Sequence, residues 1–256
     1  MNKIQQLFKN KKNILSVYFT AGYPELNDTA TIIKELEKNN ADLIEVGIPF
    51  SDPLADGPTI QDSSSIALKN GINPNLVFKQ IQSIKNQTNI PLIIMAYLNQ
   101  MIAFGEDNFL EECKKSNIQA LIIPDLPISE YKKKYKKMFE EYNLSNIFLI
   151  TPQTSNERIL EIDELSDTFI YMVSSNSVTG TKKDIDNAQI QYFERIKNMN
   201  LKNPTLIGFG ISNNKTFTEA CKYANGAIIG SAFIKKISEK GELKDKISNF
   251  IKEIKN

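Results

Sequence analysis

Hydrophobic residues along this chain gather in eight short runs, and longer stretches of mixed polarity separate them. The runs cover residues 14–21, 41–48, 91–98, 120–126, 146–151, 168–174, 204–210 and 226–232. Uninterrupted apolar runs of this length are typical of strands that are buried on both faces, as in parallel sheets. The pattern therefore predicts eight buried strands.

The segments between the runs carry apolar residues at helical spacing. The two clearest stripes are Tyr131, Tyr135, Met138, Phe139 and Tyr142, and Leu243, Ile247, Phe250, Ile251 and Ile254. Each stripe would form one face of an amphipathic helix. Strands and helices thus alternate along the whole chain, which predicts an α/β fold, a single-domain (β/α)8 TIM barrel over residues 1–256. A doubly wound open sheet is the alternative, although no GxGxxG follows the first run.

Composition narrows the class of protein. The chain has 256 residues, 41% of them hydrophobic, and a formal net charge of +1. No basic stripe with interleaved aromatic residues points to nucleic acid, and the lysine-rich stretch 132–137 is interpreted as a solvated helix face. No apolar run approaches the roughly 20 residues that span a bilayer. The two cysteines, Cys113 and Cys221, are expected to be reduced, which favours a cytoplasmic protein.

The chain contains no histidine. The most frequent general acid–base residue and the most frequent metal ligand are therefore missing, and two distant cysteines do not form a zinc pattern. We expect no metal site. Any proton transfer must use carboxylates, tyrosine, lysine, cysteine or water.

Glu45 is a carboxylate in the middle of an apolar run, 41–48. It could be solvated or paired with a lysine at the end of a strand. An ionised glutamate with apolar neighbours on both sides is costly to bury, however, and desolvation would raise its pKa toward neutrality. In a barrel, catalytic residues lie at the C-terminal ends of strands and in the loops that follow. We interpret Glu45 as a proton-transfer group.

The acidic loop that follows carries Asp52 and Asp56 among three prolines, Pro49, Pro53 and Pro58. An ordinary Asp-Gly turn at Asp56 is one interpretation. The prolines would also make the loop rigid enough to hold Asp56 over a substrate. Asp52 is expected to be a turn or interaction residue.

Glycines end the last two apolar runs, in GFGIS (208–212) and GSA (230–232). Backbone N–H groups at such turns can bind an anion, and the loops after strands 7 and 8 often hold phosphate in these barrels. Simple turns are the alternative. The polar segment 174–186 is interpreted as a lid that closes on substrate, or as a surface loop without function.

Six segments together resemble the α subunit of tryptophan synthase. They are YFTAGYP (18–24), IEVGIPFSDPLADGPTIQ (44–61), IPDLP (123–127), SVTG (177–180), GFGIS (208–212) and GSA (230–232). The resemblance runs nearly end to end and implies a reaction. Members of this family cleave indole-3-glycerol phosphate into indole and glyceraldehyde 3-phosphate by a retro-aldol step that uses no cofactor or metal.

The resemblance also implies roles for individual residues. Glu45 and Asp56 match the catalytic carboxylates, Asp56 accepting the indole N–H and Glu45 moving protons at C3 and at the glycerol hydroxyl. The matches to the substrate-binding residues are Tyr18, Ile122, Tyr171 and Thr179, and the matches to the phosphate-binding residues are Gly180, Gly210, Gly230 and Ser231. The chain departs from the family pattern at Ser175 and Ser177, where family members often have arginine and commonly glycine.

A partner follows from the same resemblance. The family's α subunit docks on a β subunit that carries pyridoxal phosphate (PLP), in an αββα complex, and indole passes to that subunit. Pro49 and Asp52, with residues 99–105, would belong to the docking face, and this chain would hold no cofactor. The rival interpretations are another phosphate-binding barrel enzyme, a docking subunit that mainly activates its partner, and a free-standing lyase that releases indole.

Overall fold

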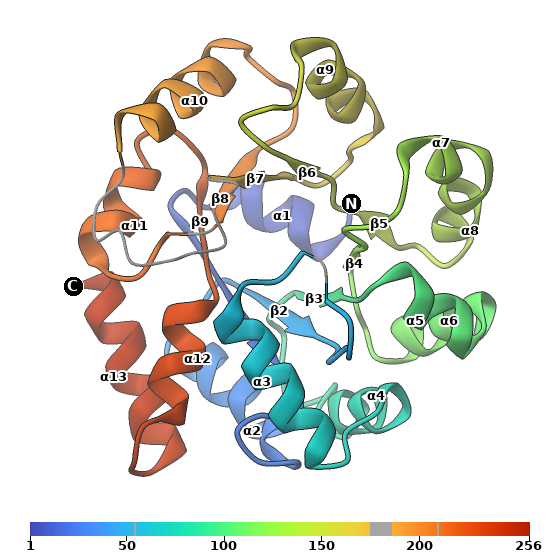
Figure 1. The fold of residues 1–256 in the computed structure, drawn as a ribbon, viewed down its shortest axis with the longest axis vertical. Coiled ribbons are helices and arrows are strands. Elements are labelled where there is room, and N and C mark those ends of the chain that lie inside the picture. Colours follow the sequence, from blue (N-terminus) through green and yellow to red (C-terminus); the bar gives the residue numbers. More distant parts are fainter. Residues whose placement is uncertain (54, 175–185, 209) are drawn as a thin grey trace.

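The computed structural model describes residues 1–53, 55–174, 186–208 and 210–256. Its strands form one parallel sheet that curls around an interior, with the helices outside it (Figure 1). The strands are β1 Ile14–Thr20, β2 Leu43–Gly47, β3 Leu92–Met95, β4 Ala120–Ile122, β5 Ser145–Asn146, β6 Leu149–Ile150, β7 Ile170–Val173, β8 Thr205–Gly208 and β9 Gly226–Ile229. All eight predicted runs contain a strand, and the predicted TIM barrel is confirmed.

The fifth run differs from its prediction, because it contributes two very short strands in place of one. In the sheet order β5-β4-β3-β2-β1-β9-β8-β7-β6, strands β5 and β6 lie at opposite ends. The intervening residues bridge them: Ile147 N–H donates to Leu121 O at 2.9 Å, and Tyr171 N–H donates to Phe148 O at 2.9 Å. One segment thus bonds to β4 with its first half and to β7 with its second half, and this closes the barrel.

The helices surround the sheet, except for the first, which lies across one end of the barrel (Figure 1). They are α1 Lys3–Asn10, α2 Asp28–Lys38, α3 Pro58–Lys69, α4 Pro74–Gln82, α5 Leu98–Phe104, α6 Glu106–Lys115, α7 Ile128–Glu130, α8 Lys136–Glu141, α9 Asn156–Leu165, α10 Asn187–Asn198, α11 Asn214–Ala220, α12 Ser231–Ser238 and α13 Leu243–Lys255. The C-terminal apolar stripe forms one helix, α13, as predicted. The stripe at 131–142 does not, since a π-helical stretch, Tyr131–Tyr135, separates α7 from α8.

Helix α1 lies across the N-terminal end of the barrel. Its Ile4 is fully buried, and Asn2, the N-cap, donates from Nδ2 to Ser145 Oγ at 3.1 Å. Gln5 Nε2 donates to Asp167 O at 2.7 Å, next to the start of the sixth predicted run. With this end covered, the opposite end, where the strands finish, is left for a site.

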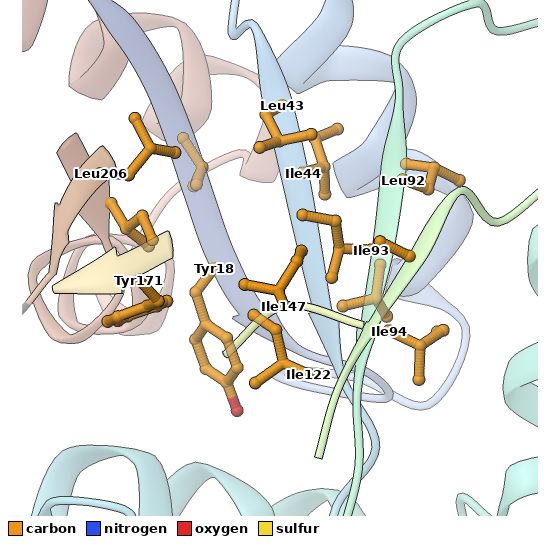
Figure 2. Close-up of a cluster of buried hydrophobic side chains, with 14 of the residues drawn as sticks. Tyr18, Leu43, Ile44, Leu92, Ile93, Ile94, Ile122, Ile147, Tyr171 and Leu206 are labelled. Atoms are coloured by element: carbon orange, nitrogen blue, oxygen red, sulfur yellow. The ribbon is translucent and has the colours of Figure 1, made fainter. Parts of the chain in front are cut away.

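Apolar side chains fill the space inside the sheet and between the sheet and the helices as one continuous cluster. Figure 2 shows part of it, with Leu43 and Leu206 toward one end of the strands and Tyr18 and Ile122 toward the other. The prediction of a single domain over residues 1–256 stays a prediction, which this undivided core supports.

The two cysteines are free, and Cys113 is buried in the core. Within the described ranges, no helix has both the length and the apolar character that crossing a bilayer requires.

Candidate active site

Glu45 lies in the middle of β2, side by side with Tyr18 of β1 and Ile93 of β3 in the sheet register. Its side chain is 2% exposed, and its Oε2 atom has no hydrogen-bond partner among the described residues. Burial in these apolar surroundings, with a smaller contribution from the negative charge of Asp56, raises the pKa of Glu45 to about 8. The carboxyl group is therefore mostly protonated at neutral pH.

Asp56 follows β2, in the loop that leads into α3. Gly57 is the N-cap of that helix and Pro58 its first residue, and Gln61 Nε2 donates to Asp56 O at 2.8 Å. The side chain is buried, and this burial raises the pKa of Asp56 to about 6, although a hydrogen bond from Tyr97 opposes the rise. Asp56 is thus mainly ionised at neutral pH, unlike its neighbour Glu45.

Two tyrosine rings stand beside these carboxyl groups, and each occupies space left by a glycine. A Cβ atom at Gly47 would lie 2.2 Å from the Tyr18 hydroxyl oxygen, and one at Gly208 would lie 2.2 Å from that of Tyr171. Burial, and then the negative charges of Glu45 and Asp56, hold the pKa of Tyr171 well above its usual value. Both tyrosines, which are widely separated in sequence, therefore face the same pair of carboxyl groups.

Ile122, at the end of β4, is 1% exposed and contributes an apolar side chain at the same end of the barrel as Tyr18 (Figure 2). The structure therefore places Glu45, Asp56, Tyr18, Tyr171 and Ile122 at one end of the barrel, and the roles that the resemblance implies for them stay predictions.

Tyr97 is a site residue that the sequence analysis did not identify. It follows β3, is 4% exposed, and its hydroxyl group accepts a hydrogen bond from Ala55 N–H at 3.0 Å. The same hydroxyl bonds the Asp56 carboxylate. The only available signal was its place at the end of the apolar run 91–98, where an aromatic residue is hard to distinguish from an ordinary core residue.

The glycine turns lie at the ends of β8 and β9. Gly210 has φ +74°, a conformation that favours glycine, and Gly230 is close to Tyr18, since a Cβ there would lie 3.3 Å from the ring. Gly230 is also the N-cap of α12, and Ser231 is the first residue of that helix. Thr179 and Gly180, with Ser175, Ser177 and most of the predicted lid, lie outside the described residues.

Of the two residues predicted at a docking face, Asp52 is exposed and Pro49 is buried. Asp52 is open to a partner, whereas Pro49 is buried and its carbonyl oxygen accepts from Gln100 Nε2 at 2.8 Å. Among the residues that the structure describes, no group of three or more acidic or sulfur side chains is arranged to hold a metal ion.

The sequence profile of the tryptophan synthase alpha chain matches residues 4–256. The chain belongs to the tryptophan synthase alpha chain family.

Several relatives show how much of the chain this likeness covers. The tryptophan synthase alpha chain of Flavobacterium johnsoniae is 58% identical over 255 residues, and the match covers 100% of both chains. That of Bacteroides fragilis is 50% identical and covers 93% of this chain and 91% of its own. A solved structure of the tryptophan synthase A-subunit of Pyrococcus furiosus, 34% identical, superposes with a TM-score of 0.88 and covers 95% of this chain and 98% of its own.

Tryptophan synthase alpha chains cleave indole-3-glycerol phosphate, so this member of the family is a carbon–carbon lyase of tryptophan biosynthesis.

Proposed function

We propose that this chain cleaves indole-3-glycerol phosphate into indole and glyceraldehyde 3-phosphate with Glu45 and Asp56 as its catalytic residues. One observation carries this assignment. Two buried carboxyl groups lie at the C-terminal end of the barrel, where the charge of Asp56 acts on Glu45, and burial raises the pKa of Glu45 to about 8 and that of Asp56 to about 6. Such a pair can divide the roles of acid and anion at neutral pH.

The reaction breaks the bond between C3 of the indole ring and the glycerol side chain. C3 must gain a proton, and the hydroxyl group on the neighbouring glycerol carbon must lose one as the aldehyde forms. Protonated Glu45 can donate to C3, and the resulting carboxylate can then accept the hydroxyl proton, which returns Glu45 to its starting state. Its apolar surroundings favour the protonated form with which the cycle begins.

Asp56 would act on the ring nitrogen. Protonation at C3 places positive charge on the indole nitrogen, and an ionised carboxylate that accepts the N–H stabilises this charge where it develops. Tyr18, Tyr171 and Ile122 supply the aromatic and apolar surfaces against which the indole ring would pack. Their side chains are all less than 9% exposed, so they form a low-dielectric wall around the two carboxyl groups.

The phosphate would lie at Gly210, Gly230 and Ser231. Backbone N–H groups at the N-terminus of a helix bind anions, and α12 begins at Ser231 with no side chain capping its first turn. Gly180 would complete this part of the site, and Thr179 would contact the catalytic Asp56. Both belong to the segment outside the described residues.

A β subunit is the proposed partner, and a structure of a tryptophan synthase complex from Pyrococcus furiosus superposes on this chain with a TM-score of 0.86. The exposed side chains of Asp52 and Asn99, and Ile102 with 49% exposure, offer a surface of mixed polarity for docking. PLP would belong to that partner. We also propose that this chain holds no cofactor of its own and that the protein is cytoplasmic.

The test replaces each carboxyl group by its amide. Glu45→Gln and Asp56→Asn should each lower kcat by about 10²-fold or more, because general acid–base and charge stabilisation each contribute at this level. Release of glyceraldehyde 3-phosphate from indole-3-glycerol phosphate is measured with and without a β subunit, beside Glu164→Gln, whose side chain is 75% exposed in a surface ion pair. If both amide variants keep wild-type rates and unchanged circular dichroism spectra, Glu45 and Asp56 are not the catalytic residues.

A further inference from the structure

Gln100, in the first turn of α5, joins two loops at the C-terminal end of the barrel. Its Nε2 donates to Pro49 O at 2.8 Å, and its Oε1 accepts from Tyr97 N–H at 3.0 Å. One half-buried side chain thus ties the loop after β2 to the residues that follow β3. A side-chain amide is suited to this bridge because it carries a donor and an acceptor on the same carbon.

Tyr97 carries the connection on to Asp56. Its ring stacks on Phe50 with centroids 5.1 Å apart and an interplanar angle of 29°. Its hydroxyl group accepts from Ala55 N–H at 3.0 Å and bonds the Asp56 carboxylate. The loop after β2 is therefore gripped near its start, at Phe50, and again at its end, at Ala55 and Asp56, by a single tyrosine.

The orientation of Tyr97 depends in turn on Gln100. The backbone of Tyr97 is the N-cap of α5, and its N–H group is satisfied by the Gln100 side chain. Without the Gln100 side-chain amide, both this N–H and the Pro49 carbonyl oxygen lose a hydrogen-bond partner in a part-buried region, which favours rearrangement of the two loops.

From this geometry we propose that Gln100 is a positioning residue of the lyase, which holds the loop after β2 and Tyr97 in register so that the Asp56 carboxylate meets the indole N–H. The proposal rests on the proposed role of Asp56. Gln100 itself would not touch substrate.

The test uses the complete chain and three substitutions. Gln100→Leu keeps the approximate volume and removes both hydrogen bonds, whereas Gln100→Glu keeps the acceptor and removes the donor. Gln87→Leu is the matched control. Gln87 Nε2 also donates to a backbone carbonyl oxygen, that of Ser83 at 3.3 Å, but this hydrogen bond is exposed to solvent.

We expect Gln100→Leu to lower kcat for indole-3-glycerol phosphate by about tenfold or more, because a misplacement of about 1 Å can cost about 10²-fold, and to change KM less than kcat. Gln100→Glu should retain part of the rate, and Gln87→Leu all of it. The acid limb of the kcat profile should move to higher pH in Gln100→Leu, since Asp56 loses the hydrogen bond that favours its ionised form.

Other titratable side chains near Asp56 could also contribute to the acid limb of the kcat profile. The elements packed around Asp56 bring four such side chains toward it, Glu45, Tyr18, Tyr171 and Tyr97, and Asp125 lies near Tyr97. The substrate phosphate is the same for every variant, so a shift between variants belongs to the protein.

A double substitution separates positioning from folding. If Gln100 acts through Tyr97, then Gln100→Leu combined with Tyr97→Phe should lose less activity than the product of the two single losses. A wild-type kcat in Gln100→Leu, or a lower melting temperature with an unmoved acid limb, would overturn the proposal. Failure of the proposed function would instead show in Asp56→Asn, as a retained rate.

Discussion

Glu45 and Asp56 carry the same chemical group in different surroundings. Glu45 lies within a strand with apolar neighbours, whereas Asp56 lies in a loop and bonds to the Tyr97 hydroxyl. Burial raises the pKa of both carboxyl groups, but the hydrogen bond limits the rise at Asp56. Between about pH 6 and pH 8, the Glu45 carboxyl group is therefore mostly neutral and the Asp56 carboxyl group mostly charged.

This separation predicts a bell-shaped dependence of kcat on pH. Activity should fall below pH 6 as Asp56 takes up a proton, because its pKa is about 6, and above pH 8 as Glu45 loses one, because its pKa is about 8. The measurement is kcat at saturating indole-3-glycerol phosphate from pH 5 to 9. The alkaline limb is the decisive test of Glu45, because a phosphate ester does not ionise in that pH range. A flat rate from pH 7 to 9 would contradict the role of Glu45.

Single residues differ in how well sequence could identify them. Glu45 was identifiable because a charge in an apolar run conflicts with the pattern around it. Tyr97 was not, because a tyrosine at the end of an apolar run fits the pattern, and only the fold brings Asp56 to its hydroxyl group. Gln100 lies in the segment 99–105 that was predicted for docking, but its bridging role was not identifiable, because its two partners are backbone atoms that sequence does not reveal.

At the scale of elements, the strands were predicted well and their ends less well. The run 91–98 suggested a strand to residue 98, whereas β3 ends at Met95 and α5 begins at Leu98. Apolar character continues beyond the hydrogen-bonded strand because the following residues are also buried. The division of the run 146–151 between β5 and β6 has no sequence signal, since both halves are equally apolar and the difference lies in which neighbour each half bonds.

Strands β1 and β2 must approach closely where the Tyr18 ring passes over Gly47. Gly47→Ala should lower kcat/KM at least tenfold and stability by about 1–3 kcal/mol, because the new Cβ would lie 2.2 Å from the Tyr18 hydroxyl oxygen and displace the ring. Steady-state kinetics and urea unfolding measure the two effects.

Gly71→Ala is the control for this prediction. The φ angle of Gly71 is +94°, so an alanine there strains the backbone. Nothing lies within 4 Å of the added Cβ, so the substitution does not touch the site. Equal activities of the two variants would show that Tyr18 tolerates displacement.

At the scale of the whole molecule, Asp42 connects the two ends of the chain. It forms ion pairs with Lys11, which follows α1, and with Lys255 at the end of α13, where Nζ lies 3.7 Å from Asp42 Oδ2. The same oxygen accepts from Leu15 N–H in β1 at 2.9 Å. The carboxylate is buried, so these contacts fasten the first strand and the last helix together.

Removing this carboxylate tests the connection. Asp42→Ala should reduce the free energy of unfolding by about 1–3 kcal/mol, because it leaves the buried Leu15 N–H without its partner. Urea unfolding gives this value, and kcat of the folded protein should stay at the wild-type level. Glu164→Ala, which breaks an exposed pair with Lys202, should change stability by less than about 1 kcal/mol. If the two variants are equally stable, Asp42 does not act as a fastening point.

The raised pKa values of Glu45 and Asp56 make the charge state of the site observable through proton exchange with solvent. Most proteins contain histidines whose titration dominates proton exchange with solvent near neutrality, but this chain has none. The buried carboxyl groups Glu45 and Asp56, with pKa values of about 8 and about 6, exchange protons with solvent in this interval of pH. Protons released or taken up when the substrate binds would report directly on the catalytic pair, once those of the phosphate are subtracted, so an ordinary indicator dye could follow the charge state of the site without a label.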